Sequence, residues 1–517
     1  MTNRHYIVHD NMLAGVEMTA PGHLVQPTQW RRAHNFHFTP MLEQVPLKVE
    51  SDLSFSGKIL WAGFVPTVSG VGYFLILTDE GLFYRDGSRP SGAAAKQSDE
   101  RWATCVYNGR LYYTNPANPI RYSDGTRDRQ LSGAPAGKYL LAWYDHLVVG
   151  WPTYKGASYP QRIMISHLYD FTQWDASSSN EADFYDLVEW QRADYPYIGI
   201  TGMAELNGLL VVYTPTAIIP VQYVGLPKVI MVLGEQRVAN VGNAFPWALV
   251  ALDKVHFFYD GIEQNFFAYD GQQVLPIGDP VRKWFAETIS PDAALQRKTW
   301  AYVDVEQREV HWVFIAGSSN TYNQELIFNY RQKAWSTADT KEFFCFCAGL
   351  QDLLTVGELE GTVGDLEGTI GDLGEGVELP RLYGATSKFL VDADSKTADG
   401  EFEGMESVLE TGDFHYGSLH DMKEVDAVVV NAYHSGGDGA EVYVHGRQML
   451  VDEGGNTDPN WATLSPVGMW TNNTTDGLLT FLAVAGRIFR YRFVFKKARA
   501  VKFLAFSAGV RGKGAER

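Results

Sequence analysis

Cysteine and histidine are the residues of this chain best suited to bind a metal or to act as a nucleophile. Cys345 and Cys347 lie one residue apart in an apolar stretch, whereas zinc sites usually place about two to four residues between paired cysteines. His5 and His9 are four residues apart, but no glutamate follows His5 and no helical pattern surrounds the pair. The cysteines fit the buried positions of a core strand better. We therefore predict no metal site.

Carboxylates could support glycoside hydrolysis, which usually needs two positioned acidic side chains. Residues 122–126 superficially resemble the Asp-box turn of sialidases, but they lack its intervening residues and its closing tryptophan. The sequence also lacks nucleophile-elbow, zinc-protease, phosphate-loop and dinucleotide-binding motifs. We predict that the protein is not an enzyme, that it has no catalytic or cofactor-binding residues, and that it needs no cofactor.

A third chemistry is nucleic-acid binding, for which basic and aromatic residues alternate between residues 489 and 502. Arg490 and Arg492 alternate with aromatic side chains that can stack on bases. The same pattern is typical of a half-buried strand with a solvated basic face, and we favour that interpretation. The net charge of −18 argues against a protein that wraps nucleic acid. It is compatible with a channel through which DNA passes without sticking.

The elements that would carry any site are short strands joined by tight turns. Aromatic-Asp-Gly units recur at residues 83–87, 121–125, 258–261 and 268–271, and Asn108-Gly109 separates two apolar runs. Asp-Gly and Asn-Gly are strong hairpin signals because both positions accept a positive φ. Hairpins are expected to start near residues 72, 102, 139, 202, 247 and 299. The fold class is therefore predicted as all-β, with a β-propeller of about six blades and an added C-terminal β-sandwich-like domain.

Composition divides the chain into four expected segments. Residues 1–60 form a mixed N-terminal segment, and residues 61–345 form the propeller blades. Residues 346–400 are an acidic, glycine-rich connection with a seven-residue repeat at 355–375, which could complete the propeller. Residues 401–517 form a C-terminal β-domain with a basic tail. No stretch is apolar enough for a membrane span, and no signal peptide is recognised, so synthesis in the cytoplasm is expected.

Charge is unevenly distributed. Residues 341–424 contain 19 Asp and Glu against 5 Lys and Arg, whereas basic residues dominate from residue 487 onward. Candidate acidic residues that line a channel are Glu358, Glu360, Asp365, Glu367 and Asp372. Candidate basic residues for contacts between subunits are Arg490, Arg492, Lys496, Lys497 and Arg499. Opposite charges on two regions suit repeated contacts around a ring.

Several segments resemble tail proteins of short-tailed bacteriophages. A strand that ends at Ser166 runs into Asp170, Phe171 and Trp174, which is similar to a phrase common in those proteins. Residues 409–414 and the following strand at 426–430 resemble their C-terminal part. The repeat at 355–375 resembles their Gly-Thr-Trp-Asp-Asp-Leu repeats, with Val-Gly in place of Trp-Asp.

The resemblance implies a tail nozzle or hub protein of the packaged-DNA-stabilisation class, located in the virion. Such a protein forms a ring, commonly a homo-hexamer, below the portal and adaptor proteins. It extends and gates the DNA-ejection channel, anchors tail fibres or spikes, and lets DNA pass without sequence-specific binding. Two alternatives stay open. One is a carbohydrate-binding or glycan-cleaving propeller that recognises a receptor, and the other is a host-type propeller scaffold that binds partner proteins.

Overall fold

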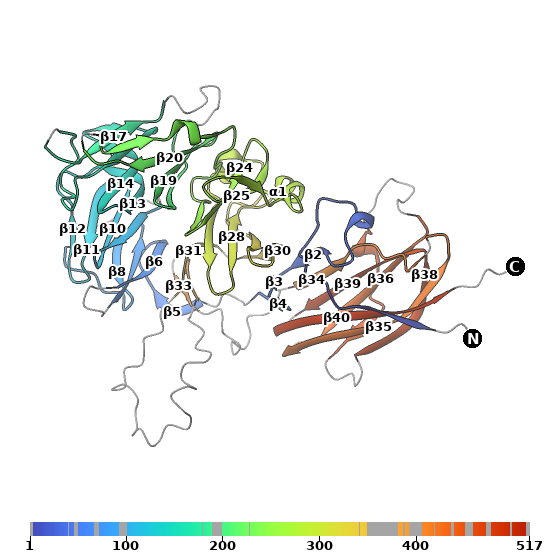
Figure 1. Cartoon of the computed structure of the whole chain (residues 1–517). Coiled ribbons are helices and arrows are strands. Elements are labelled where there is room, and N and C mark those ends of the chain that lie inside the picture. Colours follow the sequence, from blue (N-terminus) through green and yellow to red (C-terminus); the bar gives the residue numbers. More distant parts are fainter. Residues whose placement is uncertain are drawn as a thin grey trace, which may run out of the picture. The chain divides into compact units, whose positions relative to one another are not determined.

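The computed structural model describes most of the chain, as strands and connecting turns (Figure 1). The residues outside the described part are 1–3, 40, 46–49, 67–71, 93–100, 178, 189–198, 227, 341, 349–380, 386–387, 392–405, 418, 436–438, 450–458, 472–476, 497–498 and 513–517. The predicted all-β class is confirmed, since strands far outnumber the short helices in the described part. Those helices are α1 (Arg282–Thr288), α2 (Ala293–Gln296), η1 (Gly22–Leu24), η3 (Gly234–Gln236) and η5 (Trp461–Thr463).

The chain folds into two compact units, each assembled from separate stretches of sequence. Unit 1 comprises Met1–Pro46, Pro276–Thr340 and Lys396–Arg517, and unit 2 comprises Leu47–Leu275 and Lys341–Ser395. This division differs from the four consecutive segments expected from composition. The hairpin predicted near residue 299 forms, but its strands join a sheet of unit 1.

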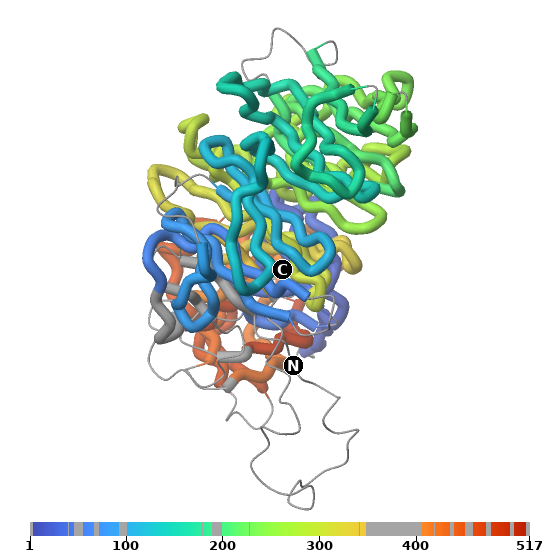
Figure 2. The backbone as a smooth tube through the Cα atoms, turned by 90° about the vertical axis from the view of Figure 1, so that its left-hand side faces the viewer, coloured from blue at the N-terminus to red at the C-terminus, as the bar shows by residue number. Residues whose placement is uncertain are grey.

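Four of the five described sheets of unit 2 are antiparallel sheets that follow one another along the chain, from blue through teal to green in Figure 2, and the fifth combines an early strand with three strands that come after residue 340. Two of the sheets are small: one contains β31 (Phe343–Ala348), β32 (Arg381–Ala385), β33 (Lys388–Val391) and β5 (Glu50–Ser54), and the other contains β6 (Ile59–Val65), β7 (Tyr73–Thr78) and β8 (Gly81–Tyr84). The largest sheet contains β9 (Ala103–Tyr107), β10 (Arg110–Asn115), β11 (Asn118–Ser123), β12 (Asp128–Gln130), β13 (Ala136–Trp143), β14 (His146–Tyr154), β15 (Ala157–Ser158), β16 (Arg162–Ile165) and β17 (Asp183–Asp186). The next sheet along the chain contains β18 (Gly202–Leu206), β19 (Leu209–Tyr213), β20 (Ala217–Tyr223), β21 (Ile230–Val232) and β22 (Val238–Ala239), and it is followed by the sheet of β23 (Val250–Leu252), β24 (Val255–Asp260), β25 (Asn265–Tyr269) and β26 (Val274–Pro276).

The turn residues act as the sequence predicts. Asn108-Gly109 joins β9 to β10, and Asn207-Gly208 joins β18 to β19, each with both residues at positive φ. Gly125, at φ +87°, adopts a conformation that L side chains rarely adopt. Asp260 differs from the other Asp-Gly aspartates because it is buried and accepts hydrogen bonds from three backbone amides.

Hydrogen bonds between neighbouring turns tie the sheets of unit 2 together. The donor and acceptor pairs are Tyr73 Oη to Gly109 O at 2.8 Å, Tyr107 Oη to Asp145 Oδ1 at 2.6 Å, Trp143 Nε1 to Gly208 O at 3.3 Å and Asn207 Nδ2 to Asp270 O at 3.2 Å. Three of these bonds join one sheet to the next sheet along the chain, whereas the bond from Tyr107 to Asp145 joins two turns of the same nine-stranded sheet. These turns therefore lie together on one face of unit 2.

Unit 1 contains two larger sheets. The nine-stranded sheet has the order β27 (Trp300–Asp304), β28 (Glu309–Phe314), β29 (Gln324–Asn329), β30 (Ala334–Asp339), β2 (Trp30–His34), β34 (Glu406–Thr411), β39 (Ile488–Lys496), β36 (Ala440–Arg447) and β37 (Gly468–Trp470). The six-stranded sheet has the order β3 (Phe36–Phe38), β4 (Leu42–Gln44), β40 (Arg499–Gly512), β35 (Lys423–Ser435) and β38 (Leu478–Gly486), and β1 (His5–His9) pairs with the same edge of β40 as β4 does, further along that strand. Aromatic side chains of β39 and β40, such as Phe493 and Phe503, pack between the two sheets.

Strands far apart in the sequence complete both units. In unit 1, β1 pairs with β40, and β2 lies between β30 and β34. In unit 2, β5 pairs with β33. Such pairing covers strand edges and ties down the ends of the chain. Neither unit therefore folds completely until chain segments several hundred residues apart have met.

The β29–β30 hairpin offers a direct test of turn geometry. Lys333 is exposed and has a φ of +56°, which costs an L residue roughly 1–2 kcal/mol. We expect Lys333→Gly to raise the free energy of unfolding by about 1 kcal/mol, measured by urea denaturation. The matched control is Lys283→Gly in α1, where glycine should instead cost about 1 kcal/mol. Equal losses from both substitutions would contradict the turn conformation.

Candidate functional site

The predicted charged residues fall into three groups in the structure. The channel candidates Glu358, Glu360, Asp365, Glu367 and Asp372 all lie outside the described residues, and so does Lys497. Arg499 begins strand β40. The remaining three, Arg490, Arg492 and Lys496, all belong to β39, which lies between β34 and β36 in the nine-stranded sheet.

Arg490 is buried in the interior of unit 1. Its side chain is 1% exposed, with Nε 2.9 Å from Asp413 Oδ1 and Nη1 3.4 Å from Glu410 Oε1. Arg447 also pairs with Asp413. A Cβ added at Gly22 would lie 1.7 Å from Arg490 Nη2, so glycine leaves the room that the guanidinium occupies. This corrects the prediction for Arg490, because a side chain held inside its own subunit is not available to another copy.

The expected solvated face of β39 is also wrong for this part of the strand. Residues of both alternating sets are buried, since Phe489, Arg490 and Tyr491 are all nearly inaccessible to solvent. The basic face is covered by η1 and by the segment that follows β34. Burial raises the pKa of Glu410, and the nearby charges of Arg490 and Arg492 oppose that rise. The cluster is therefore a desolvated ion network whose members depend on one another.

Arg492 and Lys496 keep some exposure. Arg492 Nη2 lies 3.5 Å from Glu406 Oε1, and the Arg492 guanidinium lies 5.8 Å from the ring centroid of Trp461. Lys496 Nζ lies 3.0 Å from Glu441, and the Lys496 side chain is 51% exposed. Both pairs form within one chain. A contact between subunits through these two residues stays a prediction.

The segments that resemble phage tail proteins form packing elements. Phe171 and Trp174 are buried in one core cluster of unit 2, and Trp174 Nε1 donates to Phe171 O at 2.7 Å. Asp170 accepts from the Thr172 amide and hydroxyl, which stabilises the turn before them. In unit 1, residues 409–414 supply Glu410 and Asp413, the two carboxylates that hold Arg490. The buried residues of both segments thus serve the packing of the fold.

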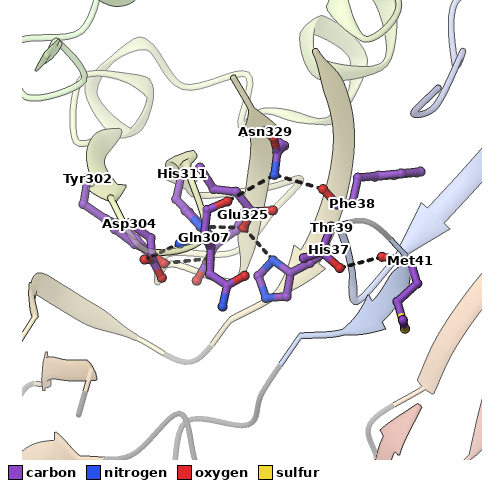
Figure 3. A network of polar contacts seen from close by, with 11 residues as sticks. His37, Phe38, Thr39, Met41, Tyr302, Asp304, Gln307, His311, Glu325 and Asn329 are labelled. Carbon is purple, nitrogen blue, oxygen red and sulfur yellow. Dashed lines mark hydrogen bonds and ion pairs between the residues drawn. The ribbon is translucent and has the colours of Figure 1, made fainter. Parts of the chain in front are cut away.

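A second buried polar network joins β3 to the β28–β29 hairpin of unit 1. His37 Nδ1 lies 2.5 Å from Glu309 Oε2, and His311 Nδ1 lies 3.1 Å from Glu325 Oε2. His311 Nε2 is 3.4 Å from Glu309 Oε2, an ion pair too long for a good hydrogen bond. Figure 3 shows His37 pointing toward His311 and Glu325. Nearby, the side-chain amide of Asn329 donates hydrogen bonds to Phe38 O and to Gln307 O.

Two members of this network, Glu309 and His311, have shifted pKa values, and both shifts favour the charged form. Burial alone would raise the pKa of Glu309, but the charges of His37 and His311 and the hydrogen bond from His37 lower it to about 2. Burial alone would lower the pKa of His311, but the nearby carboxylates of Glu309 and Glu325 raise it. Tyr302 stacks on the His311 ring at 4.5 Å and donates to Glu325 at 3.3 Å. Glu309 and His311 are therefore a buried pair of opposite charges.

The network has acid–base residues but no access for a substrate. His37, Glu309, His311 and Glu325 are each at most 5% exposed. Catalysis requires contact between such groups and a reacting molecule, so the geometry supports a structural role. Sequence reasoning missed this cluster. The available signal was Glu309 and His311, which alternate with apolar residues in a strand and so lie on one face of it.

Within the described residues, no group of three or more His, Cys, Asp or Glu side chains has a geometry that could hold a metal ion. Cys345 is buried, and Cys105, Cys345 and Cys347 are free thiols. In the part of the chain that the structure describes, no helix is long and apolar enough to cross a membrane.

Comparison with known proteins gives no family assignment. No protein-family profile matches the chain, and no curated protein matches it. Among solved structures, the extracellular domain of a hybrid two-component system from B. thetaiotaomicron matches at 11% identity and a TM-score of 0.39, covering 77% of this chain and 46% of that one. An exported protein from Bacteroides fragilis matches at 9% identity and a TM-score of 0.29, covering 67% of this chain and 98% of that one. The chain thus spans less than half the length of the first, and TM-scores this low do not establish a shared fold.

Proposed function

We propose that this protein is a structural component of a short-tailed bacteriophage virion, a tail nozzle or hub that forms a ring. The observation that carries the proposal is the completion of each unit by strands from distant parts of the chain, β1 with β40 and β5 with β33. A conduit for DNA must resist mechanical load without fraying at its ends. Strand pairing that covers edges and ties down the termini suits that task.

The proposed fold of unit 2 is a β-propeller, and that of the C-terminal part of unit 1 is β-sandwich-like. Support for the propeller comes from the succession of antiparallel sheets and from the hydrogen bonds between neighbouring turns. The pair between β5 and β33 joins early and late segments in one sheet, as in a ring closed by both ends of the chain. The aromatic contacts between β39 and β40 support the sandwich.

The proposed partners follow from the same function. The chain would assemble as a homo-hexamer below the portal and adaptor, carry fibres or spikes, and let DNA pass without sequence-specific binding. A net charge of −18 suits a wall that repels phosphate. The buried state of the Arg490 and His311 clusters supports a role without catalysis.

Co-sedimentation with purified portal–adaptor complexes tests this proposal. We expect the full-length chain to bind saturably, with a fixed number of copies per complex. A Lys496→Glu variant should weaken the ring if this exposed residue contributes to subunit contacts, whereas Lys283→Glu in α1 serves as an exposed lysine control. No saturable binding by the unaltered chain would reject the nozzle assignment.

A further inference from the structure

The turn face of unit 2 exposes tyrosines around one carboxylate. Tyr144 is 52% exposed and Tyr169 is 67% exposed. Between them lies Asp145, which accepts hydrogen bonds from Tyr107 Oη at 2.6 Å and from Tyr169 Oη at 2.8 Å. The three tyrosines come from different turns, and a single side chain fixes two of their hydroxyls. We name Tyr107, Tyr144, Asp145 and Tyr169 the tyrosine face.

Backbone strain is concentrated in this face. Tyr144, Asp145 and Tyr169 have φ values of +46°, +59° and +58°, in the left-handed region. Each such residue costs on the order of 1–3 kcal/mol, and glycine would avoid most of that cost. The Tyr144 ring also stacks on Tyr223, with centroids 5.1 Å apart and an interplanar angle of 18°. Rigid, exposed aromatic rings kept at strained positions are a typical feature of binding surfaces.

A cavity with a polar rim lies beside the tyrosine face. Its volume is about 580 Å³, within the range of sites for small molecules. The shared element is the Asn207-Gly208 turn, because Asn207 lines the cavity and a Cβ on Gly208 would lie 3.1 Å from Tyr144 Oη. Glu235, Gln236, Arg237 and Gln272 also line the cavity and bring carboxylate, amide and guanidinium groups to it.

We propose that the tyrosine face and this cavity together bind a neutral oligosaccharide. Sugar rings present apolar C–H faces that pack on tyrosine rings, and their hydroxyls exchange hydrogen bonds with amides and carboxylates. The hydrogen bonds from Tyr107 and Tyr169 lower the pKa of Asp145, which keeps this acceptor ionised. The carboxylates of Asp145 and Glu235 and the guanidinium of Arg237 bring charges of both signs to the site, which suits a neutral ligand, and these polar groups disfavour an apolar one. The inference goes beyond the proposed ring function and does not depend on it.

An array of bacterial surface polysaccharides and linear oligosaccharides, probed with the labelled full-length chain, tests this site. Tyr144→Asn removes the ring, and asparagine tolerates the left-handed backbone. Gln272→Ala alters the cavity without touching the turn. The matched control is Tyr433→Asn in unit 1, where the tyrosine is 57% exposed. Melting temperatures of all four proteins confirm that they are folded.

We expect the unaltered chain and Tyr433→Asn to retain the same saccharide, and both site variants to weaken binding by about tenfold or more. The proposal is overturned if the unaltered chain retains no saccharide on the array. It is also overturned if either site variant still binds the saccharide as strongly as the unaltered chain. Ring formation is measured separately. Saccharide binding by a chain that stays monomeric would reject the proposed ring and support this site. A ring that binds no saccharide would support the proposed ring and reject this site.

Discussion

Replacement of Arg490 by alanine should lower the free energy of unfolding by about 3–5 kcal/mol, the usual cost of breaking a buried ion network. The substitution leaves the carboxylates of Glu410 and Asp413 in the interior with one fewer cation, and Asp413 keeps its ion pair with Arg447. Urea denaturation followed by tryptophan fluorescence measures the loss. Hydrogen exchange of β34 and β39 peptides then shows whether unit 1 accounts for it.

The matched control lies on the same strand. Lys496 pairs with Glu441 but its side chain is about half exposed, so Lys496→Ala should cost at most about 1 kcal/mol. A double substitution, Arg490→Met with Glu410→Leu, should recover part of the loss because it removes a buried positive and a buried negative charge together. If Arg490→Ala and Lys496→Ala have the same small effect, the Arg490 cluster is not desolvated.

The second large effect concerns the pH dependence of unit 1. The lowered pKa of Glu309 contributes stability that is present above pH 4.5 and is lost as the pH falls toward about 2. The raised pKa of His311 contributes stability that is present below pH 6.5 and is lost as the pH rises through that raised value. The network should therefore stabilise unit 1 most between about pH 4.5 and 6.5.

Glu309→Gln should remove the part of the pH dependence in which unit 1 loses stability as the pH falls below 4.5. A pKa of about 2 against an ordinary value of 4.5 corresponds to about 3 kcal/mol of stability above pH 4.5. We expect the variant to lose about that amount at pH 6 and to show no further loss between pH 4.5 and 2 from this group. Glu287→Gln, at an exposed position of α1, should leave the profile unchanged. Parallel curves for the unaltered chain and Glu309→Gln would contradict the assigned role.

The local parts of the fold could be predicted from sequence because their signals are local. Asn108-Gly109 and Asn207-Gly208 identified their hairpins since the turn conformation depends on those two residues alone. The composition of the units could not be predicted in this way. Strand β2 reaches its place between β30 and β34 through contacts about three hundred and more residues away, and no short pattern encodes them.

The same distinction explains the errors at the candidate site. Alternation in β39 correctly indicated a strand, but the burial of Arg490 depends on Gly22 and Asp413, which lie far away in the sequence. The network of His37 and Glu309 likewise joins residues that only the folded chain brings together. The charge pattern alone suggested a surface for subunit contacts. In the structure, Arg492 and Lys496 form ion pairs with Glu406 and Glu441 of the same chain.

The most direct test of the central claim is mass photometry of the purified chain, alone and mixed with portal–adaptor complexes. The nozzle assignment predicts a discrete ring, or the saturable addition of a fixed number of copies, with a hexamer as the expected count. A chain that stays monomeric in both conditions would contradict it.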